Sequence, residues 1–189
     1  MDSITELSRY LIPALWLIWI AGWWIAARDV KPAHWQVTRR EALVNHGPLV
    51  LGMMLMMVPV PGLSQHLLPA GPAVPFAALV LTALGLAFAC WARWHLGGNW
   101  SAGVTVKEGH TLIRSGPYRW VRHPIYTGID LALLGSALLL GSPRGFLGAA
   151  LIMLSFVIKL RAEEARMRET FADYDAYSRR TARLIPGVY

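Results

Sequence analysis

A run of thirteen residues, GPYRWVRHPIYTG at positions 116–128, combines two arginines, a histidine, three aromatic rings and two prolines. A second polar feature, the adjacent Glu163 and Glu164, follows later in the chain. Aromatic faces bind cationic and flat groups, guanidinium groups bind carboxylates, and carboxylates bind ammonium groups. These side chains together could bind an organic ligand that carries opposite charges and an aromatic ring.

Several common chemistries lack their sequence signatures. The chain has no Gly-rich phosphate loop ending in GK[ST], no HExxH, and no Ser or Cys nucleophile in a recognisable frame. The single cysteine, Cys90, excludes an internal disulfide and a multi-cysteine metal site, so we expect no metal. An amino-acid-bearing nucleoside such as S-adenosylmethionine is compatible with the polar residues, although other ligands would satisfy the same set.

The composition predicts that these residues are carried by membrane helices. The chain is 55% hydrophobic and only 15% charged, against about 25% charged residues in a soluble domain. Residues 10–27 and 42–92 contain no Asp, Glu, Lys or Arg. Because a helix needs about 20 apolar residues to cross the hydrocarbon core, we expect an all-α, polytopic transmembrane bundle.

We expect about five spans and a C-terminal amphipathic helix. The spans are residues 10–27, 48–68, 74–96, 127–141 and 145–160, the second interrupted by Pro59, Pro61 and Gly62. The last two are short and should form a tight helical hairpin. The chain is expected to be a single integral membrane domain over 1–189, with N-terminal spans in 1–92 and the ligand-binding half in 93–189.

The distribution of positive charge predicts the orientation. With the N-terminus outside, the exterior segments contain only Arg9 and Arg144, and the other 16 of the 18 Lys and Arg lie inside. This asymmetry follows the positive-inside rule. It places the 116–128 loop and the tail on the cytoplasmic side of a membrane, which we take to be a bacterial inner membrane. The net charge of +7 is therefore a topology signal, and no nucleic-acid partner is expected.

The tail after the fifth span has helical periodicity. Leu160, Met167 and Phe171 recur on one face, with Glu164 inside this apolar stripe and Glu163 at its border. A carboxylate on a buried face is costly unless a cation or hydrogen-bond donor meets it. The alternative is a solvated face on which the glutamates pair with Arg166 and Arg168.

Three segments together resemble the isoprenylcysteine carboxyl methyltransferase family. They read HTLIRSGPYRWVRHPIYTG, RAEEARMRETFADYDAY and RLIPG, and the resemblance covers residues 96–187. The wider superfamily includes membrane phosphatidylethanolamine N-methyltransferases. The resemblance implies transmembrane helices that hold S-adenosylmethionine at their cytosolic end, between the last two helices and their flanking segments.

The resemblance also implies roles for particular residues. The residues expected around the cofactor are Lys107, His110, Thr111, Leu112, Ile113, Tyr118, His123, Pro124, Ile125, Tyr126, Glu163 and Glu164. The family has a substrate-contacting arginine four residues before its cofactor glutamate, where this chain has Lys159, with Arg161 nearby. A lysine lacks the two-point carboxylate fork of arginine, so the substrate can differ.

The expected activity is methyl transfer from S-adenosylmethionine to a lipophilic acceptor, by family default the carboxylate of an isoprenylcysteine. The expected partners are the lipid bilayer and this small-molecule or prenylated substrate. Alternatives are a phospholipid amine or thiol methyltransferase, a non-catalytic binding or transport protein, and a haem or quinone protein using His66 and His95.

Two charged residues keep alternative interpretations. Arg122 is a candidate for catalytic positioning, or it snorkels to the membrane surface. Asp130, just inside the fourth span, is either functional or a partner of Arg119 or Arg122.

Overall fold

The computed structural model describes residues 3–27, 39–97 and 112–188 of the chain. Its helices are α1 (Ser3–Ala27), α2 (Arg39–Met57), α3 (Ala73–Leu96), the short 3-10 turn η2 (Gly116–Arg119), α4 (Pro124–Leu140), α5 (Pro143–Thr170) and α6 (Tyr174–Arg180). An isolated β-bridge joins Val121 to Ala182. The prediction of an all-α fold is confirmed.

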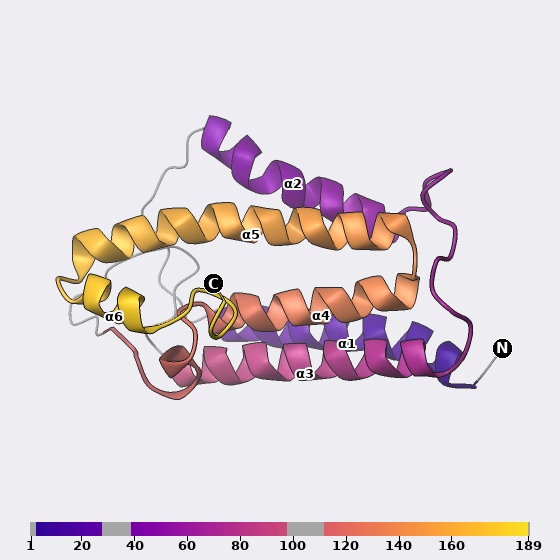
Figure 1. The fold of residues 1–189 in the computed structure, drawn as a ribbon, viewed down its shortest axis with the longest axis horizontal. Helices are drawn as coiled ribbons and strands as arrows, with labels where there is room; N and C mark the ends of the chain where they lie inside the picture. Colours follow the sequence, from indigo (N-terminus) through magenta and orange to yellow (C-terminus); the bar gives the residue numbers. More distant parts are fainter. Residues whose placement is uncertain (1–2, 28–38, 98–111, 189) are drawn as a thin grey trace.

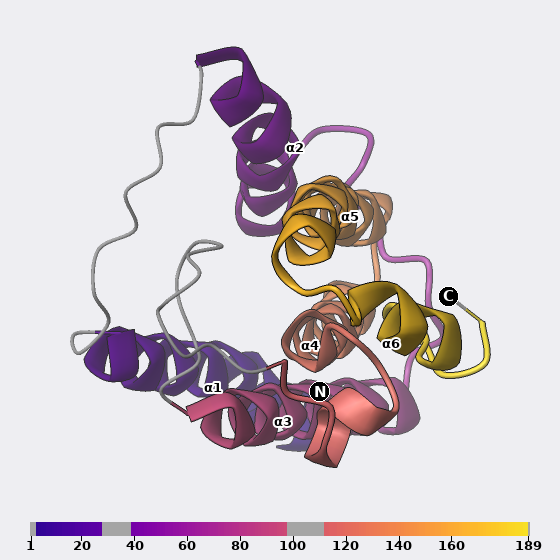
Figure 2. The same cartoon turned by 90° about the vertical axis from the view of Figure 1, so that its left-hand side faces the viewer.

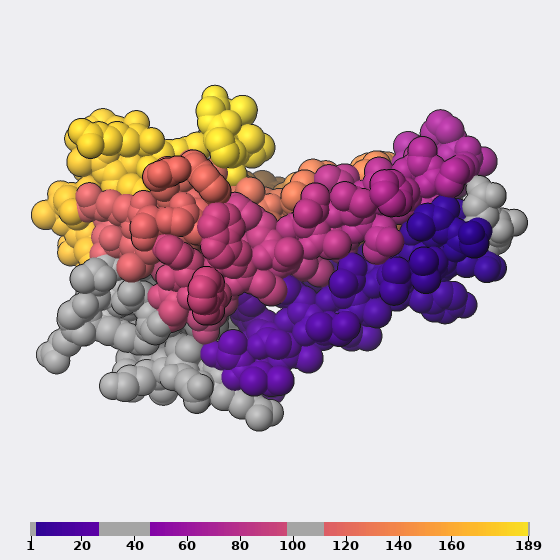
Figure 3. Space-filling model, turned by 90° about the horizontal axis from the view of Figure 1, so that it is seen from below, coloured from indigo at the N-terminus to yellow at the C-terminus, as the bar shows by residue number. Residues whose placement is uncertain are grey.

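Helices α3, α4 and α5 lie with their axes nearly parallel or antiparallel, and α2 is inclined to α5 (Figure 1). Helices α4 and α5 form an antiparallel hairpin, with α2 packed against α5 and α3 packed against α4. Figure 2 shows this order from the end of the bundle, with α6 beside the α4–α5 pair. Helix α1 lies along α3 and forms much of one face in Figure 3. Therefore the end of α3, the start of α4 and the end of α5 meet at one end of the bundle.

The helices have the length and composition of membrane spans. Three are long and apolar enough to cross a bilayer, namely Ser3–Ala26, Ala73–Leu96 and Pro143–Thr170. Shorter apolar helices are His46–Met57 and Pro124–Leu140. Large apolar side chains face outward on them, including Ile18, Met57 and Leu84. These surfaces are suited to contact with lipid, and the protein is an integral membrane protein.

Two predicted spans end at different residues in the structure. The second, expected over residues 48–68 with an interruption at Pro59, Pro61 and Gly62, ends at Met57, because the two following prolines cannot continue the helical hydrogen bonding. The fifth, expected over residues 145–160 and followed by an amphipathic helix, is part of α5, which has 28 residues against 17 in α4. The amphipathic tail segment continues the fifth span without a break, so α5 extends well beyond its partner.

A tight turn closes the end of the bundle opposite the 116–128 loop. Gly141 ends α4 with a φ of 56°, a left-handed conformation that favours glycine, and its carbonyl accepts a hydrogen bond from the Leu67 N–H at 2.7 Å. Arg144 at the start of α5 donates to the carbonyls of Leu55 and Met56 at 2.9 and 2.8 Å. A guanidinium at these carbonyls stabilises the C-terminal end of α2, where the helix dipole is negative.

Glycines set the distance between neighbouring helices. A Cβ on Gly85 of α3 would lie 2.5 Å from the Gly128 carbonyl oxygen of α4, and a Cβ on Gly128 would lie equally close to the Gly85 oxygen. Gly52 of α2 and Gly148 of α5 make a second reciprocal contact of this kind. Small residues allow helix backbones in a membrane to approach closely and gain van der Waals contact. The first contact fixes α3 against α4, and the second fixes α2 against α5.

The substitution Gly85→Ala should therefore destabilise the bundle. The added methyl group would meet backbone atoms of Gly128 and Ala132, which cannot rotate away. We expect the free energy of unfolding in detergent to fall by about 2 kcal/mol, the usual cost of overpacking. Gly22→Ala is the matched control, because a Cβ there meets no atom within 4 Å. Equal stability of the two variants would contradict this account of the packing.

Candidate active site

The 3-10 turn η2 is held against the last turn of α3. Gly116 has a φ of 57°, and a Cβ there would collide with the His95 ring at 2.7 Å. The His95 Nε2 atom lies 2.9 Å from the Ser115 hydroxyl, and its ring stacks on Tyr118 with centroids 6.5 Å apart. Tyr118 is buried. His95 therefore supports the loop, which gives this histidine a structural role.

Helix α6 fixes the same turn from the other side. The Tyr177 hydroxyl donates a hydrogen bond to the Tyr118 carbonyl at 2.7 Å, and both residues are buried. Burial, together with the neighbouring Tyr174, raises the pKa of Tyr177. The hydroxyl thus keeps its proton and remains a donor at physiological pH.

His123 connects the loop to α5. It precedes Pro124, which occupies the first turn of α4, where a missing N–H costs nothing. Its Nδ1 atom lies 3.9 Å from Glu163 Oε2, and its Nε2 atom lies 3.2 Å from Glu164 Oε1. The loop that follows α3 and the part of α5 that extends beyond α4 therefore meet at this imidazole.

Glu163 lies on an aromatic, partly open side of the α4–α5 pair. Its Oε1 atom accepts a hydrogen bond from the Tyr126 hydroxyl at 3.0 Å and lies 3.8 Å from Lys159 Nζ. The Lys159 ammonium is 5.6 Å from the centroid of the Tyr126 ring, and this ring packs against Phe156 at 5.1 Å. The Glu163 side chain is 20% exposed, so its carboxylate is reachable from outside the protein.

Glu164, the next residue, is completely buried and faces a different set of partners. Arg122 Nε lies 2.9 Å from its Oε1 atom. Arg183 binds both oxygens, with Nε 3.1 Å from Oε1 and Nη2 2.8 Å from Oε2. Arg168 adds a longer contact of 3.5 Å. The cationic donors offset the free-energy cost of removing the Glu164 carboxylate from water, as expected from its place in the apolar stripe.

The predicted site residues fall into three groups. Lys107, His110 and Thr111 lie outside the described residues. His123, Tyr126 and Lys159 contact the two glutamates, Pro124 follows His123, and Tyr118 lies in η2 with its hydroxyl 3.4 Å from the Ala92 carbonyl oxygen. Leu112 and Ile113 are half-buried on the approach to η2, Ile125 is half-buried in the first turn of α4, and Arg161 is exposed on α5.

Three alternative interpretations can be compared with the geometry. Glu164 does not lie on a solvated face, because its side chain is fully buried. Arg119 is exposed and lies over the Trp120 ring, and Arg122 is bound to Glu164. Among the described residues, the buried Oδ1 atom of Asp130 has no hydrogen-bond partner, so the expected pairing with Arg119 or Arg122 is not observed.

The haem interpretation also lacks support in the described part of the chain. His66 lies beside Gly141 at one end of the bundle, and His95 lies beside Gly116 at the other. The two rings cannot bind one haem. Residues 3–27, 39–97 and 112–188 contain no group of three or more His, Cys, Asp and Glu able to hold a metal ion.

Sequence reasoning did not assign a role to Arg183 or to the backbone around it. In the structure Arg183 binds Glu164, and the Arg122 N–H donates a hydrogen bond to the Ala182 carbonyl at 2.8 Å. The RLIPG motif was the available signal, but a motif does not reveal which part of the fold it contacts.

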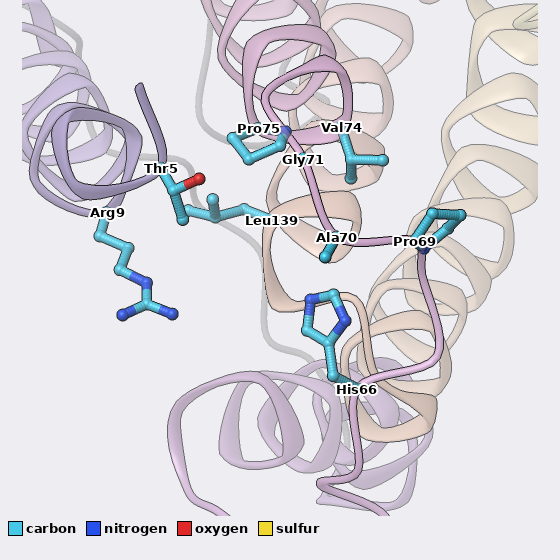
Figure 4. A pocket seen from close by; sticks show the side chains of 9 residues that line it. All are labelled: Thr5, Arg9, His66, Pro69, Ala70, Gly71, Val74, Pro75 and Leu139. Atoms are coloured by element: carbon cyan, nitrogen blue, oxygen red, sulfur yellow. The ribbon is translucent and has the colours of Figure 1, made fainter. Parts of the chain in front are cut away.

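A cavity of about 270 Å³ lies at the opposite end of the bundle (Figure 4). Its walls include Thr5 and Arg9 of α1, His66, Val74 at the start of α3, and Leu139 near the end of α4. These residues are separated by the length of the helices from His123 and the glutamates. The cavity is therefore not part of the candidate active site.

Fold and site together define a helical integral membrane protein with a charged, aromatic site at one end of the α4–α5 hairpin. Residues 78–169 match the sequence model of the isoprenylcysteine carboxyl methyltransferase (ICMT) family. This match confirms the resemblance that the motifs predicted.

Curated relatives match parts of this chain. A Saccharomyces cerevisiae protein-S-isoprenylcysteine O-methyltransferase is 34% identical over 87 residues, which cover 44% of this chain and 36% of the relative. A Neurospora crassa phosphatidyl-N-methylethanolamine N-methyltransferase is 28% identical over 116 residues, covering 59% of this chain and 53% of the relative. The matches therefore span about a third to a half of these relatives.

The fold itself is similar to that of a solved eukaryotic intramembrane Ras methyltransferase, ICMT. The TM-score is 0.64 at 17% sequence identity, and the match covers 100% of this chain and 69% of the solved one. This likeness supports the arrangement of helices.

The substitution Tyr177→Phe tests whether α6 holds the loop. Removing the hydroxyl leaves the buried Tyr118 carbonyl without this donor. We expect a loss of about 1 kcal/mol in the free energy of unfolding, as for a typical buried hydrogen bond. Thermal unfolding in detergent measures it. Tyr10→Phe is the control, because Tyr10 is 78% exposed, and a similar loss in both variants would refute the assignment.

Proposed function

We propose that the protein is an S-adenosylmethionine-dependent methyltransferase that acts on a lipophilic acceptor. The observation that carries the proposal is the convergence of His123 and Glu163, whose side chains lie 3.9 Å apart although His123 precedes α4 and Glu163 lies on α5. Both belong to motifs of the matched family, and both lie at the end of the bundle where cationic residues concentrate.

The residues present fit the cofactor by their chemistry. Glu163 offers a partly exposed carboxylate, which suits the ammonium group of the cofactor's amino-acid part. The Tyr126 ring offers an aromatic face of the kind that binds a sulfonium or an adenine. We propose that His123, Tyr118 and the segment 110–113 complete the binding surface, with Lys107 as a further contact. Glu164 contributes from behind His123, since its own oxygens are already bound by arginines.

The bound cofactor supplies a methyl group on a positively charged sulfur. Held by Glu163, Tyr126 and His123, the cofactor would give this methyl group to the acceptor and would leave as the neutral thioether S-adenosylhomocysteine. The protein must hold the acceptor about 3–3.5 Å from that carbon and exclude water, so positioning provides much of the rate acceleration. A carboxylate acceptor is already ionised at neutral pH and needs no general base.

The position of the site suits two reactants of different solubility. We propose that the N-terminus lies outside and the candidate site faces the cytoplasm of a bacterial inner membrane, because the cationic residues concentrate on that side. A water-soluble methyl donor then enters from the cytoplasm, and a lipophilic acceptor enters from the bilayer.

The family default for the acceptor is the carboxylate of an isoprenylcysteine. A phospholipid amine is the second candidate, because the Neurospora crassa relative named for amine methylation aligns with 59% of this chain. An amine acceptor must lose a proton before it attacks, so its methylation rate should fall steeply as the pH drops below the amine's pKa.

Binding of S-adenosylhomocysteine, measured by calorimetry in detergent, is the direct test. We expect wild type to bind and Glu163→Gln to bind about tenfold more weakly, because an ammonium loses its charged partner. Glu169→Gln, on the exposed last turn of α5, is the matched control and should bind as wild type does. Absence of binding to wild type would refute the proposed function.

The acceptor is identified by transfer of a labelled methyl group. The two substrates are a farnesylcysteine analogue and phosphatidylethanolamine vesicles. Base treatment releases the label from a methyl ester but not from a methylamine. A base-stable product formed only from the vesicles would replace the isoprenylcysteine assignment with the amine alternative.

Lys159 tests how the acceptor is held. Its ammonium lies between Glu163 and the Tyr126 ring and is half exposed, so it can reach an acceptor carboxylate. We expect Lys159→Ala to raise the KM for farnesylcysteine by roughly tenfold, and Lys159→Arg to retain activity. Arg179→Ala, which changes an exposed residue of α6, is the control. A larger effect on S-adenosylhomocysteine affinity than on acceptor KM would assign Lys159 to the methyl donor instead.

A further inference from the structure

The C-terminal strap, residues 181–184, runs beside the segment that leads into α4. Val121 and Ala182 form a parallel β-bridge. The Arg122 N–H donates to the Ala182 carbonyl at 2.8 Å, and the His123 N–H donates to the Arg183 carbonyl at 3.2 Å. The strap therefore fixes the backbone on both sides of the Arg122–His123 peptide, immediately before the first turn of α4.

Side chains strengthen this pairing at both ends. The Thr127 hydroxyl donates to the Leu184 carbonyl at 2.7 Å, one turn into α4. The Arg122 guanidinium donates to the Ser178 carbonyl at 2.8 Å and also to the Thr181 carbonyl. Hydrogen bonds from a charged donor are stronger than neutral ones, and these carbonyls lie in or beside the strap.

The strap also carries Arg183, whose guanidinium binds at the centre of the candidate site. Arg183 binds both oxygens of the buried Glu164, and Glu164 Oε1 lies 3.2 Å from His123 Nε2. The Glu164 side chain is 1% exposed and the Arg183 side chain 18%, so water competes little with this contact. The opposite ring nitrogen of His123 faces Glu163. Arg183 thus fixes the carboxylate that supports the imidazole from behind.

We infer that the strap is a positioning element of the methyl-donor site, and that Arg183 is its positioning residue, acting on the ligand through Glu164 and His123. The inference rests on the proposed function. Local helix formation alone does not set the His123 ring, because His123 precedes α4 and its backbone N–H is bound by the strap. The strap supplies this constraint, although Arg183 lies 60 residues after His123 in the sequence.

Arg183→Gln in the full-length protein tests the inference. We expect about tenfold weaker binding of S-adenosylhomocysteine, because the two-point contact to Glu164 is lost. Arg183→Lys keeps the charge without the fork and should fall between this variant and wild type. Arg180→Gln, which removes the same charge from an exposed position on α6, should bind as wild type does. Equal affinity of Arg183→Gln and wild type would overturn the inference.

A double-mutant cycle separates positioning from general destabilisation. If Arg183 acts through His123, Arg183→Gln should weaken binding much less in a His123→Ala background than in wild type. Additive effects would overturn the inference. If Arg183→Gln does not fold, Thr127→Val replaces it in the cycle, with an expected loss of about threefold for one hydrogen bond to the strap. Failure of wild type to bind would instead refute the proposed function, so the two failures are distinguishable.

Discussion

The carboxylate of Glu164 is the interaction on which the active end of the molecule depends. It is fully buried at the end of α5, and it receives Arg122 from the loop before α4 and Arg183 from the strap. A buried ion pair contributes less to stability than its contacts suggest, since both charges lose water, but removing one partner is strongly destabilising. The cluster therefore acts chiefly as a constraint, because the three segments are compatible with this carboxylate in one arrangement only.

The same helix turns its neighbouring carboxylate to another environment. Consecutive residues on an α-helix point about 100° apart, so Glu163 and Glu164 face largely different partners. Glu164 faces the arginines inside the protein, and Glu163 faces Tyr126 and Lys159 on the partly open side. His123 lies close to both carboxylates, 3.9 Å from Glu163 and 3.2 Å from Glu164. Glu164 thus holds the surrounding segments together, whereas Glu163 is partly exposed. The His123 imidazole lies between the two carboxylates.

A feature of the fold or of the candidate site could be predicted from the sequence where residues adjacent in the chain cause it. The spans, the interruption after Met57 and the burial of Glu164 follow from apolar runs, prolines and helical periodicity, which are properties of adjacent residues. The identity of the partners of Glu164 does not follow from adjacent residues. Arg166 and Arg168 are the near candidates in sequence, yet Arg122 and Arg183 make the closest contacts, because the helix hairpin and the strap bring them there. Asp130 illustrates the same limit, since its expected arginine partners are engaged elsewhere.

Packing in the apolar half of the bundle has consequences for chemistry at its end. Gly85 and Gly128 let α3 and α4 touch through their backbones, and His95 at the end of α3 then supports Gly116 in the loop. A shift of α3 along α4 would carry His95 away from η2 and move the backbone that precedes His123. Misplacement of reacting groups by about 1 Å is enough to slow a reaction that depends on alignment by roughly 10²-fold. For that reason the close contact between Gly85 and Gly128 bears on the proposed function, because it sets where the segment before His123 lies relative to α3.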